Sequence, residues 1–435
     1  MTIPVESTDV LVVGGGPAGS TVAAFLSRAG HKVVLLEKSS HPKFHIGESL
    51  LPMNLPILER LGVADQLAEL GVPKMGADFT IPSRREEPLT YRFERALGHS
   101  PRHAYEVRRS EFDHMLFRNA GMEGAETIEQ CEVISVTPLN NHAHKVHARH
   151  TDGIEKIWET RFLVDASGRD TFLARTHKWK KRSTKHASAA IYAHFRGVER
   201  REGDNAGNIS LYWFSDGWMW MIPLHDDVMS IGAVCNPDYL RQRKGQDTAQ
   251  FLINTLKLQP DAFSRMKNAV QVREAQVTGN YSYDSSRMSG PGYLLIGDAY
   301  AFIDPVFSSG VYLAMNSAEQ AIQPIQHWLE RDKRAYRVAA HKFEADIRRG
   351  LSAFSWFIVR FTTPAMRALF ENPRNNWQVE QAIISFLAGD VFNNARVRRR
   401  IHLFRLIYAV ASLLTFRETF NYWKRQRKSR RQSFE

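Results

Sequence analysis

The residues with the clearest chemical pattern are three glycines near the start of the chain. Gly14, Gly16 and Gly19 have the spacing GxGxxG between an apolar segment, residues 9–13, and a segment with helical periodicity. The first glycine permits a tight turn, the second lets the backbone approach a pyrophosphate, and the third lets the helix pack against the strand. The helix N-terminus offers free N–H groups to the phosphates. The pattern predicts a dinucleotide site that includes these glycines and Ala18.

A carboxylate follows at the distance expected for ribose binding. A second apolar segment, residues 31–36, ends at Glu37, about 20 residues after the glycines, where a carboxylate accepts a hydrogen bond from a ribose hydroxyl. Because a carboxylate repels a 2′-phosphate, the pattern favours FAD or NAD over NADP. The complete strand–helix–strand unit makes this pattern more specific than an isolated glycine motif.

Two further strand-to-turn segments favour a flavin. Residues 292–296 are apolar and run into Gly297, Asp298 and Ala299, and residues 162–169 have a similar form. We expect Asp298 to hydrogen-bond the ribityl chain of a flavin, with the next helix N-terminus facing the flavin ring. Together with the glycine motif, these segments resemble the FAD enzymes built like para-hydroxybenzoate hydroxylase.

That resemblance covers about residues 8–330 and implies FAD bound in an extended form, with its phosphates at residues 14–19. It also implies that Arg109, in the run Val-Arg-Arg-Ser-Glu-Phe-Asp of residues 107–113, reaches the cofactor. No second GxGxxG unit is found for a nicotinamide domain. A separate flavin reductase is therefore implied as the source of reduced FAD.

Residues 218–223 read Trp-Met-Trp-Met-Ile-Pro, which resembles the WxWxIP pattern of flavin-dependent halogenases. A strand would place Trp218, Trp220 and Ile222 on one face. In that family, such a wall stops an organic substrate from reaching the flavin and being hydroxylated directly. An aromatic-rich core strand is the alternative interpretation.

Two other positions extend the resemblance to halogenases. Lys74 lies where those enzymes carry a lysine that hydrogen-bonds hypohalous acid or forms a haloamine, a role that requires an amine held away from bulk water. In residues 302–311, we expect the backbone N–H groups of Ser309 and Gly310 to bind chloride or bromide at a helix N-terminus. A turn that only packs against FAD is the alternative for this segment.

Longer runs, residues 42–50, 281–318 and 387–391, resemble the halogenases that act on pyrroles tethered to carrier proteins. One position departs from the tryptophan halogenases, which place a glutamate immediately before the anion-binding turn, where this chain has Phe307. The departure counts against free tryptophan as substrate. It favours a phenol or pyrrole, whose more electron-rich ring needs less help from a positioned base; no base is assigned.

The elements that must position these residues form an α/β fold. We predict a Rossmann-type, three-layer FAD-binding domain from residues 1–185 and 276–330, with part of 80–105 in the substrate layer. Period-2 spacing in residues 186–275 predicts an inserted, mostly antiparallel β-sheet module for the substrate. Residues 331–435 predict a C-terminal helical region that ends in a basic tail.

The composition is that of a packed protein with its positive charge concentrated at one end. The chain has 435 residues with a net charge of +12, and 43% of them are hydrophobic, which excludes global disorder. Residues 391–435 contain twelve basic and two acidic residues, so most of the net charge lies there. Cys131 and Cys235 cannot form a disulfide framework, and no Cys/His spacing predicts a metal site.

The basic C-terminal residues have two candidate partners and one plain alternative. They would suit an acidic acyl or peptidyl carrier protein, or peripheral contact with the inner face of an anionic membrane. They could equally form a solvated end. No nucleic-acid-reading motif accompanies them, so no nucleic-acid partner is predicted. The lack of a secretion signal and of a long apolar run predicts a cytoplasmic protein.

The sequence as a whole predicts an FAD-dependent halogenase that uses reduced FAD, O2 and chloride or bromide on a phenol or pyrrole. Two alternatives remain, namely a flavin-dependent aromatic hydroxylase and a membrane-associated reductase of isoprenoid double bonds of the geranylgeranyl type. Halide dependence separates the first from a halogenase. Anaerobic oxidation of reduced flavin by a polyprenyl substrate identifies the second.

Overall fold

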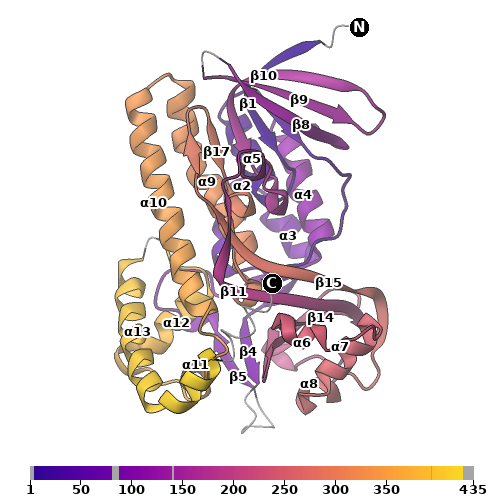
Figure 1. Cartoon of the computed structure of the whole chain (residues 1–435), viewed down its shortest axis with the longest axis vertical. Coiled ribbons are helices and arrows are strands. Elements are labelled where there is room, and N and C mark those ends of the chain that lie inside the picture. The colour runs from indigo at the N-terminus through magenta and orange to yellow at the C-terminus, as the bar shows by residue number, and fades with distance from the viewer. Residues whose placement is uncertain (1–3, 81–87, 140–141, 393, 425–435) are drawn as a thin grey trace.

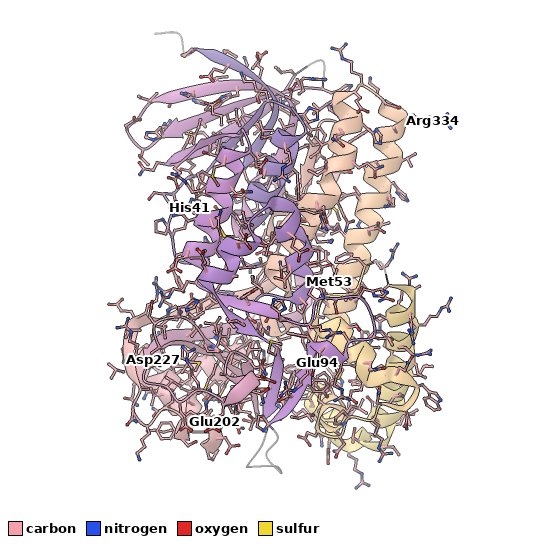
Figure 2. The ribbon with its side chains drawn as sticks, turned by 180° about the vertical axis from the view of Figure 1, so that it is seen from behind. His41, Met53, Glu94, Glu202, Asp227 and Arg334 are labelled. Carbon is pink, nitrogen blue, oxygen red and sulfur yellow. The ribbon has the colours of Figure 1, made fainter. Side chains whose placement is uncertain are left out.

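The computed structural model describes residues 4–80, 88–139, 142–392 and 394–424. Two large sheets lie at opposite ends of the molecule, and helices cover one side of each (Figure 1). Figure 2 gives the view from behind, with Arg334 in the helices beside the first sheet and Asp227 in a turn of the second. No helix within the described ranges is long and apolar enough to cross a membrane.

The first sheet has the strand order β16-β17-β10-β1-β2-β7, and β8 and β9 extend it beside β10. Its central pairs are parallel, and their branched apolar residues are buried on both faces, as parallel sheets require. The strands are β1 (Val5–Val13), β2 (Val33–Leu36), β7 (Glu126–Ile128), β8 (Cys131–Pro138), β9 (His144–His150), β10 (Glu155–Asp165), β16 (Ser289–Gly290) and β17 (Tyr293–Leu295).

Helices α1 (Pro17–Arg28), α4 (Arg109–Met122) and α9 (Ser309–Leu329) pack together on this sheet, with α1 in contact with both others. Because the central strands run parallel, their carboxyl ends meet at one edge. The glycine turn, Glu37, the turn after Asp165 and Asp298 all follow these strand ends. The topology therefore gathers the segments that the sequence analysis singled out.

The second sheet has the order β18-β15-β11-β14-β13-β12-β4-β5 and is antiparallel except between β12 and β4. Residues 191, 193 and 195 face α6–α8, while Trp218, Trp220 and Ile222 face the other way. Its strands are β4 (Gly76–Thr80), β5 (Leu89–Arg92), β11 (Lys180–Arg196), β12 (Ile209–Phe214), β13 (Gly217–Pro223), β14 (Val228–Cys235), β15 (Val270–Ser285) and β18 (Ala301–Phe302).

Strands β11 and β15 are paired from the Lys180–Ser285 end to the Arg196–Val270 end and connect the two parts of the molecule. Both strands cross the predicted ends of the substrate module, residues 186 and 275. The division of the chain into separate domains stays a prediction. A small third sheet pairs β3 (Gly71–Lys74) with β6 (Ala104–Val107). The short helices are α2 (Leu55–Leu61), α3 (Ala64–Leu70), α5 (Phe172–Thr176), α6 (Pro237–Arg241), α7 (Thr248–Leu256) and α8 (Pro260–Ser264).

The C-terminal part is helical, with α10 (Lys333–Ile358), α11 (Pro364–Glu371), α12 (Val379–Leu387) and α13 (Ala395–Leu414). Residues 416–424 are helical as well. Aromatic rings hold these helices together: the ring of Phe357 lies 4.1 Å from Phe386 and 5.4 Å from Phe404, centroid to centroid. The basic tail after residue 424 lies outside the described residues.

Candidate active site

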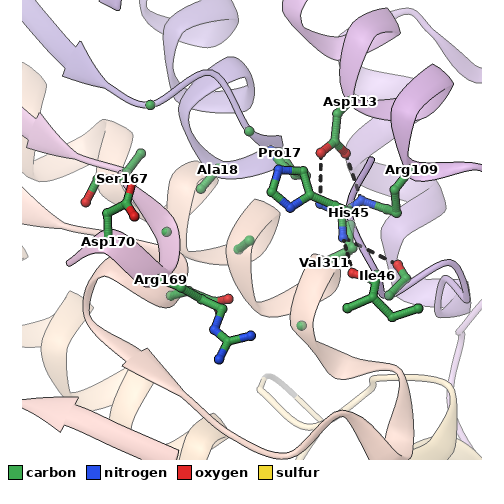
Figure 3. A pocket seen from close by; sticks show the side chains of 18 of the residues that line it. Pro17, Ala18, His45, Ile46, Arg109, Asp113, Ser167, Arg169, Asp170 and Val311 are labelled. Carbon is green, nitrogen blue, oxygen red and sulfur yellow. Dashed lines mark hydrogen bonds and ion pairs between the residues drawn. The ribbon is translucent and has the colours of Figure 1, made fainter. Parts of the chain in front are cut away.

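A cavity of about 720 Å³ lies between the carboxyl edge of the first sheet and one face of the second. This volume is in the upper range for small-molecule sites. Figure 3 shows part of its wall, with Pro17 and Ala18 of the glycine turn opposite Arg169. Of the predicted site residues, Gly14, Gly16, Ala18, Glu37, Arg109, Trp218, Trp220, Asp298 and Gly310 line it. Gly19, Lys74 and Ser309 do not.

The glycine turn has the geometry that its spacing predicts. Gly14 has a φ of +104°, and a Cβ there would lie 2.5 Å from the carbonyl oxygen of Ala166. A Cβ on Gly19 would lie 1.9 Å from the carbonyl oxygen of Gly14, so helix α1 packs directly against the turn. A Cβ on Gly16 would meet no atom within 4 Å. The turn thus leaves open space at the N-terminus of α1, where a phosphate can approach.

Glu37 is buried at the end of β2, and its carboxylate accepts hydrogen bonds from the backbone N–H groups of Gly15 and Ser39, each at 2.9 Å. It also forms an ion pair with Lys43. Burial alone would raise its pKa, but Lys43 and the two backbone donors outweigh burial and lower the pKa of Glu37. Glu37 is therefore a fixed anion at the cavity wall.

Arg109, at the start of α4, is held by two hydrogen bonds to the carboxylate of Asp113, at 2.8 and 2.9 Å. Its other nitrogen donates to the carbonyl oxygen of Ile46 at 3.2 Å (Figure 3). The pair stands one helical turn apart, which is the spacing for such contacts. These hydrogen bonds hold the guanidinium group in one orientation at the cavity wall.

Asp298 lines the cavity beyond β17, and no described donor forms a hydrogen bond with its carboxylate. Burial raises the pKa of Asp298 to about 6, although Arg169 and Arg109 oppose the shift. The carboxylate can therefore accept hydrogen bonds from a molecule bound in the cavity. The hydroxyl groups of a ribityl chain supply that kind of donor.

We expect the Asp298→Asn variant to be more stable than the wild type without cofactor at pH 8, and equally stable near pH 4. An aspartate in the unfolded chain titrates near 3.9, so the stability linked to the raised pKa of Asp298 is present below pH 4 and is lost as the pH rises through about 6. Thermal melts at the two pH values measure this, and FAD titration should show weaker binding. The exposed Asp65→Asn serves as control; a variant with the wild-type pH dependence would contradict the prediction.

The tryptophan strand presents one face to the cavity, as the alternation predicts. Trp218 and Trp220 lie 5.7 Å apart, centroid to centroid, while Met219 and Met221 belong to the core on the opposite face. The ring of Trp220 lies across Gly232 of β14, where a Cβ would be 2.3 Å from it. Its Nε1 donates to the hydroxyl of Ser230 at 3.3 Å. The glycine and the serine thus fix the ring in place.

Lys74 ends β3 and is almost wholly buried, at 2% exposure. Its ammonium group donates to the hydroxyl of Ser49 at 2.7 Å and to the carbonyl oxygen of Leu50 at 3.1 Å. Ser49 lines the cavity, and Lys74 lies directly behind it. The amine is therefore shielded from bulk water and one side chain away from the cavity.

A buried carboxylate that the sequence analysis did not single out stands beside this lysine. Oε1 of Glu106, on β6, lies 3.8 Å from the Lys74 nitrogen, and neither carboxylate oxygen has a hydrogen-bond partner within the described residues. Burial raises the pKa of Glu106 to about 7, against the effect of Lys74, and burial lowers the pKa of Lys74. The sequence does contain a signal for Glu106, because it is the one acidic residue in the otherwise apolar strand Ala104–Val107.

We expect Glu106→Gln to shift the Lys74-dependent limb of the pH–rate profile to lower pH by at least about one unit. The glutamine keeps the shape of the side chain but removes the charge that stabilises a buried ammonium. Measurement of kcat/KM for substrate turnover against pH tests this. The midpoint of the limb gives the apparent pKa of the Lys74 amine, whether its protonated or its neutral form is the active one. Glu111→Gln on α4, which pairs with Arg108, is the matched control. An unchanged limb would show that Glu106 does not act on Lys74.

The cavity residues that were not predicted include Lys43, Glu48, Ser49 and Arg169. Glu48 pairs with His194 of β11 at 3.1 Å, and Arg169 donates to the hydroxyl of Thr278 at 3.1 Å. The partners of Glu48 and Arg169 lie more than 100 residues away in the sequence, so spacing alone does not reveal these two pairs.

The predicted halide turn lies at the start of α9. Ser308 has a left-handed backbone, with a φ of 54°, immediately before the helix. Gly310 lines the cavity, whereas the Ser309 side chain is buried and its hydroxyl has no partner within the described residues. The first N–H groups of a helix have no partner within the helix. An anion bound here would contact the backbone, and halide binding stays a prediction.

Phe307 occupies the position before this turn and is packed in an aromatic core. Its ring lies 5.2 Å from Phe361 and 5.4 Å from Phe386, centroid to centroid. The ring of Phe307 therefore packs against other aromatic rings.

Comparison with known proteins agrees with this geometry. A family model described as an FAD binding domain matches residues 7–336. A flavin-dependent halogenase, gsfI, of Penicillium aethiopicum is 34% identical over 76% of this chain and 66% of its own length. The solved structure of the myxobacterial chondrochloren halogenase CndH superposes with a TM-score of 0.76 at 32% identity, over 92% of this chain and 96% of that one. The chain belongs to the flavin-dependent halogenase family.

Another member of this halogenase family, the 1H-pyrrole-2-carbonyl-[peptidyl-carrier protein] chlorinase of Pseudomonas fluorescens, is 29% identical over 93% of this chain and 94% of its own. This chain spans slightly less than two thirds of the length of the Penicillium halogenase. The predicted fold class and the FAD cofactor are confirmed. The site fits FAD, because the glycine turn leaves space at a helix N-terminus and the cavity-lining carboxylate of Asp298 has no donor among the described residues.

Proposed function

We propose that this protein is an FADH2-dependent halogenase that acts on an electron-rich aromatic compound, a phenol or a pyrrole. Reduced FAD and O2 supply the oxidising power that converts chloride or bromide into hypohalous acid, with water as the second product. Transfer of the halogen to the aromatic ring replaces a ring hydrogen and releases water, so the atoms balance. The remaining steps depend on residues of this chain.

The observation that carries this proposal is the placement of Lys74. A buried amine lies directly behind the cavity wall at Ser49, and the wall on the β13 side is formed by Trp218 and Trp220. An aromatic hydroxylase needs its substrate beside the flavin and has no use for a shielded amine. A halogenase needs an amine that holds hypohalous acid and keeps it from bulk water.

This proposal assigns a separate role to each group of site residues. Gly14, Gly16, Ala18 and Gly19 bind the FAD phosphates, Glu37 binds the ribose, and Arg109 and Asp298 orient the rest of the cofactor. The backbone of Ser309 and Gly310 binds the halide, and Lys74 presents the halogen to the ring. Trp218 and Trp220 keep the substrate from the flavin.

The proposal includes partners that agree with the resemblance to carrier-tethered pyrrole halogenases. A separate flavin reductase supplies reduced FAD, and the aromatic substrate is carried by an acidic acyl or peptidyl carrier protein. The chain acts in the cytoplasm, with its basic C-terminal residues available for contact at the inner face of a membrane. One acidic protein partner and one basic surface are complementary in charge.

Mass spectrometry of the products tests the proposal. The full chain is incubated with FAD, a flavin reductase, NADH, bromide and a panel of free and carrier-bound phenols and pyrroles. A product with the two-peak bromine isotope pattern supports halogenation and identifies the substrate type. A hydroxylated product that forms equally well without halide would identify a hydroxylase, and oxidation of reduced flavin by a polyprenyl substrate without O2 would identify an isoprenoid reductase.

A further inference from the structure

The C-terminal helices leave an unusual amount of apolar surface open to solvent. The apolar residues of the last described helical segments, residues 395–424, are divided between two faces. One face is buried, and the other carries six large side chains that are each more than half exposed. These six residues, called the exposed stripe below, are Leu406, Val410, Leu413, Leu414, Phe416 and Phe420.

Helical spacing places the four stripe residues of α13 on a single face. Position 410 is four residues after 406, and positions 413 and 414 are three and four residues after 410, so all four lie on one side of α13. Phe416 and Phe420 are one turn apart in the helical residues that follow, with their rings stacked at 5.8 Å, centroid to centroid. Contiguous apolar patches of this kind are rare on soluble monomers and mark interaction sites.

The opposite face holds α13 in place, so the stripe cannot turn inward. Ile401, Phe404 and Tyr408 are buried on that face. The ring of Tyr408 packs on Trp356 at 5.3 Å, and its hydroxyl lies 3.3 Å from that of Thr363. The helix forms the outer side of the C-terminal region in Figure 1. The stripe therefore faces outward in the folded protein.

Positive charge flanks the stripe. Arg396, Arg398 and Arg399 are exposed on the turns before Leu406, and Arg417 and Lys424 are exposed within and after the stripe. The only acidic residue from 395 to 424 is Glu418. The surface therefore combines apolar side chains with a nearly uniform positive charge.

We propose that the exposed stripe and its flanking basic residues bind the surface of an anionic lipid bilayer. A helix that lies in the plane of a membrane has this composition, because its apolar side chains enter the acyl boundary while lysine and arginine contact the headgroups. The stripe is a convex helix face, which fits a flat bilayer. A second copy of this chain would bring the same arginines against one another, which charge repulsion opposes.

Vesicle co-sedimentation of the full chain with FAD bound tests this proposal. The vesicles are phosphatidylcholine alone or phosphatidylcholine mixed with phosphatidylglycerol. We expect the wild type to sediment with the anionic vesicles and to be released by high salt. The Leu413→Ser/Leu414→Ser variant should bind at least about 10-fold more weakly, because two exposed leucines no longer enter the acyl boundary. Val338→Ser, which changes an equally exposed apolar residue on α10, should bind as the wild type does.

Other results would overturn the proposal. They are failure of the wild type to bind anionic vesicles, equal binding by the double leucine variant, and equal binding to neutral vesicles. A concentration-dependent dimer that the leucine substitutions abolish would assign the stripe to a second copy, and loss of binding to a purified carrier protein would assign it to that partner. FAD content and halogenation of a soluble aromatic are measured in parallel. Since the stripe lies outside the cavity, these two readouts should not change, and they separate a failure here from a failure of the proposed activity.

Discussion

A Lys74→Met variant is expected to bind FAD as the wild type does and to lose halogenation by about 1,000-fold or more. Methionine fills a similar volume but offers no amine, so hypohalous acid has no group to hold or activate it, and positioned proton donors contribute about 10²- to 10⁴-fold to such steps. Product yield by mass spectrometry measures the loss. NADH and O2 consumption should continue, because the cofactor residues are unchanged.

The control for this variant must deal with the buried carboxylate beside the lysine. Removal of Lys74 leaves Glu106 without its cation at 3.8 Å, and an unpaired buried charge destabilises a fold by about 3–5 kcal/mol unless it is neutralised. The double variant Lys74→Met/Glu106→Gln removes both charges and should fold well while remaining inactive. Normal product from either variant would show that Lys74 does not present the halogen.

A Gly14→Ala variant should lose FAD binding and unfold at lower temperature. The added methyl group would lie 2.5 Å from the carbonyl oxygen of Ala166, in a backbone with a φ of +104°. A left-handed conformation costs about 1–2 kcal/mol for a residue with a Cβ, and the contact forces β1 and β10 apart at the turn. Flavin fluorescence and thermal melts measure the two effects.

Gly16→Ala is the matched control, since a Cβ there meets no protein atom within 4 Å. We expect this variant to keep the melting temperature of the cofactor-free protein and still bind FAD more weakly, because its methyl group enters the space proposed for the pyrophosphate. Equal FAD binding by both variants and the wild type would contradict the assignment of this turn to the phosphates.

The cofactor half of the site could be predicted because its chemistry depends on local sequence. A parallel sheet brings the ends of its strands together, so a glycine turn, Glu37 and Asp298 after three apolar strands are gathered by topology alone. The face of the tryptophan strand followed from alternation in the same way. These patterns need no knowledge of long-range contacts.

The surroundings of Lys74 could not be predicted, because they depend on pairings between distant segments. Ser49, Glu106 and Lys74 meet only because β3 pairs with β6 and the segment before α2 lies against both. Likewise, the helical periodicity of α13 does not show which of its apolar residues the neighbouring helices cover. Both the surroundings of Lys74 and the exposed face of α13 depend on which side chains the fold buries.

The pairing of β11 with β15 has a consequence for how the cavity admits its contents. Strands β11 and β15 belong to the second sheet, and the chain connects them to β10 and β16 of the first. Their pairing runs from Lys180–Ser285 to Arg196–Val270, with shifts of register between Arg182 and Ala187 and around His194. A hinge needs a few residues that are free to change their backbone angles, and hydrogen-bonded partners on a long ladder are not free in this way. The distance between the cofactor wall and the tryptophan wall thus depends on the register in which β11 and β15 pair. A substitution that changes this register would change the width of the cavity for cofactor and halide alike.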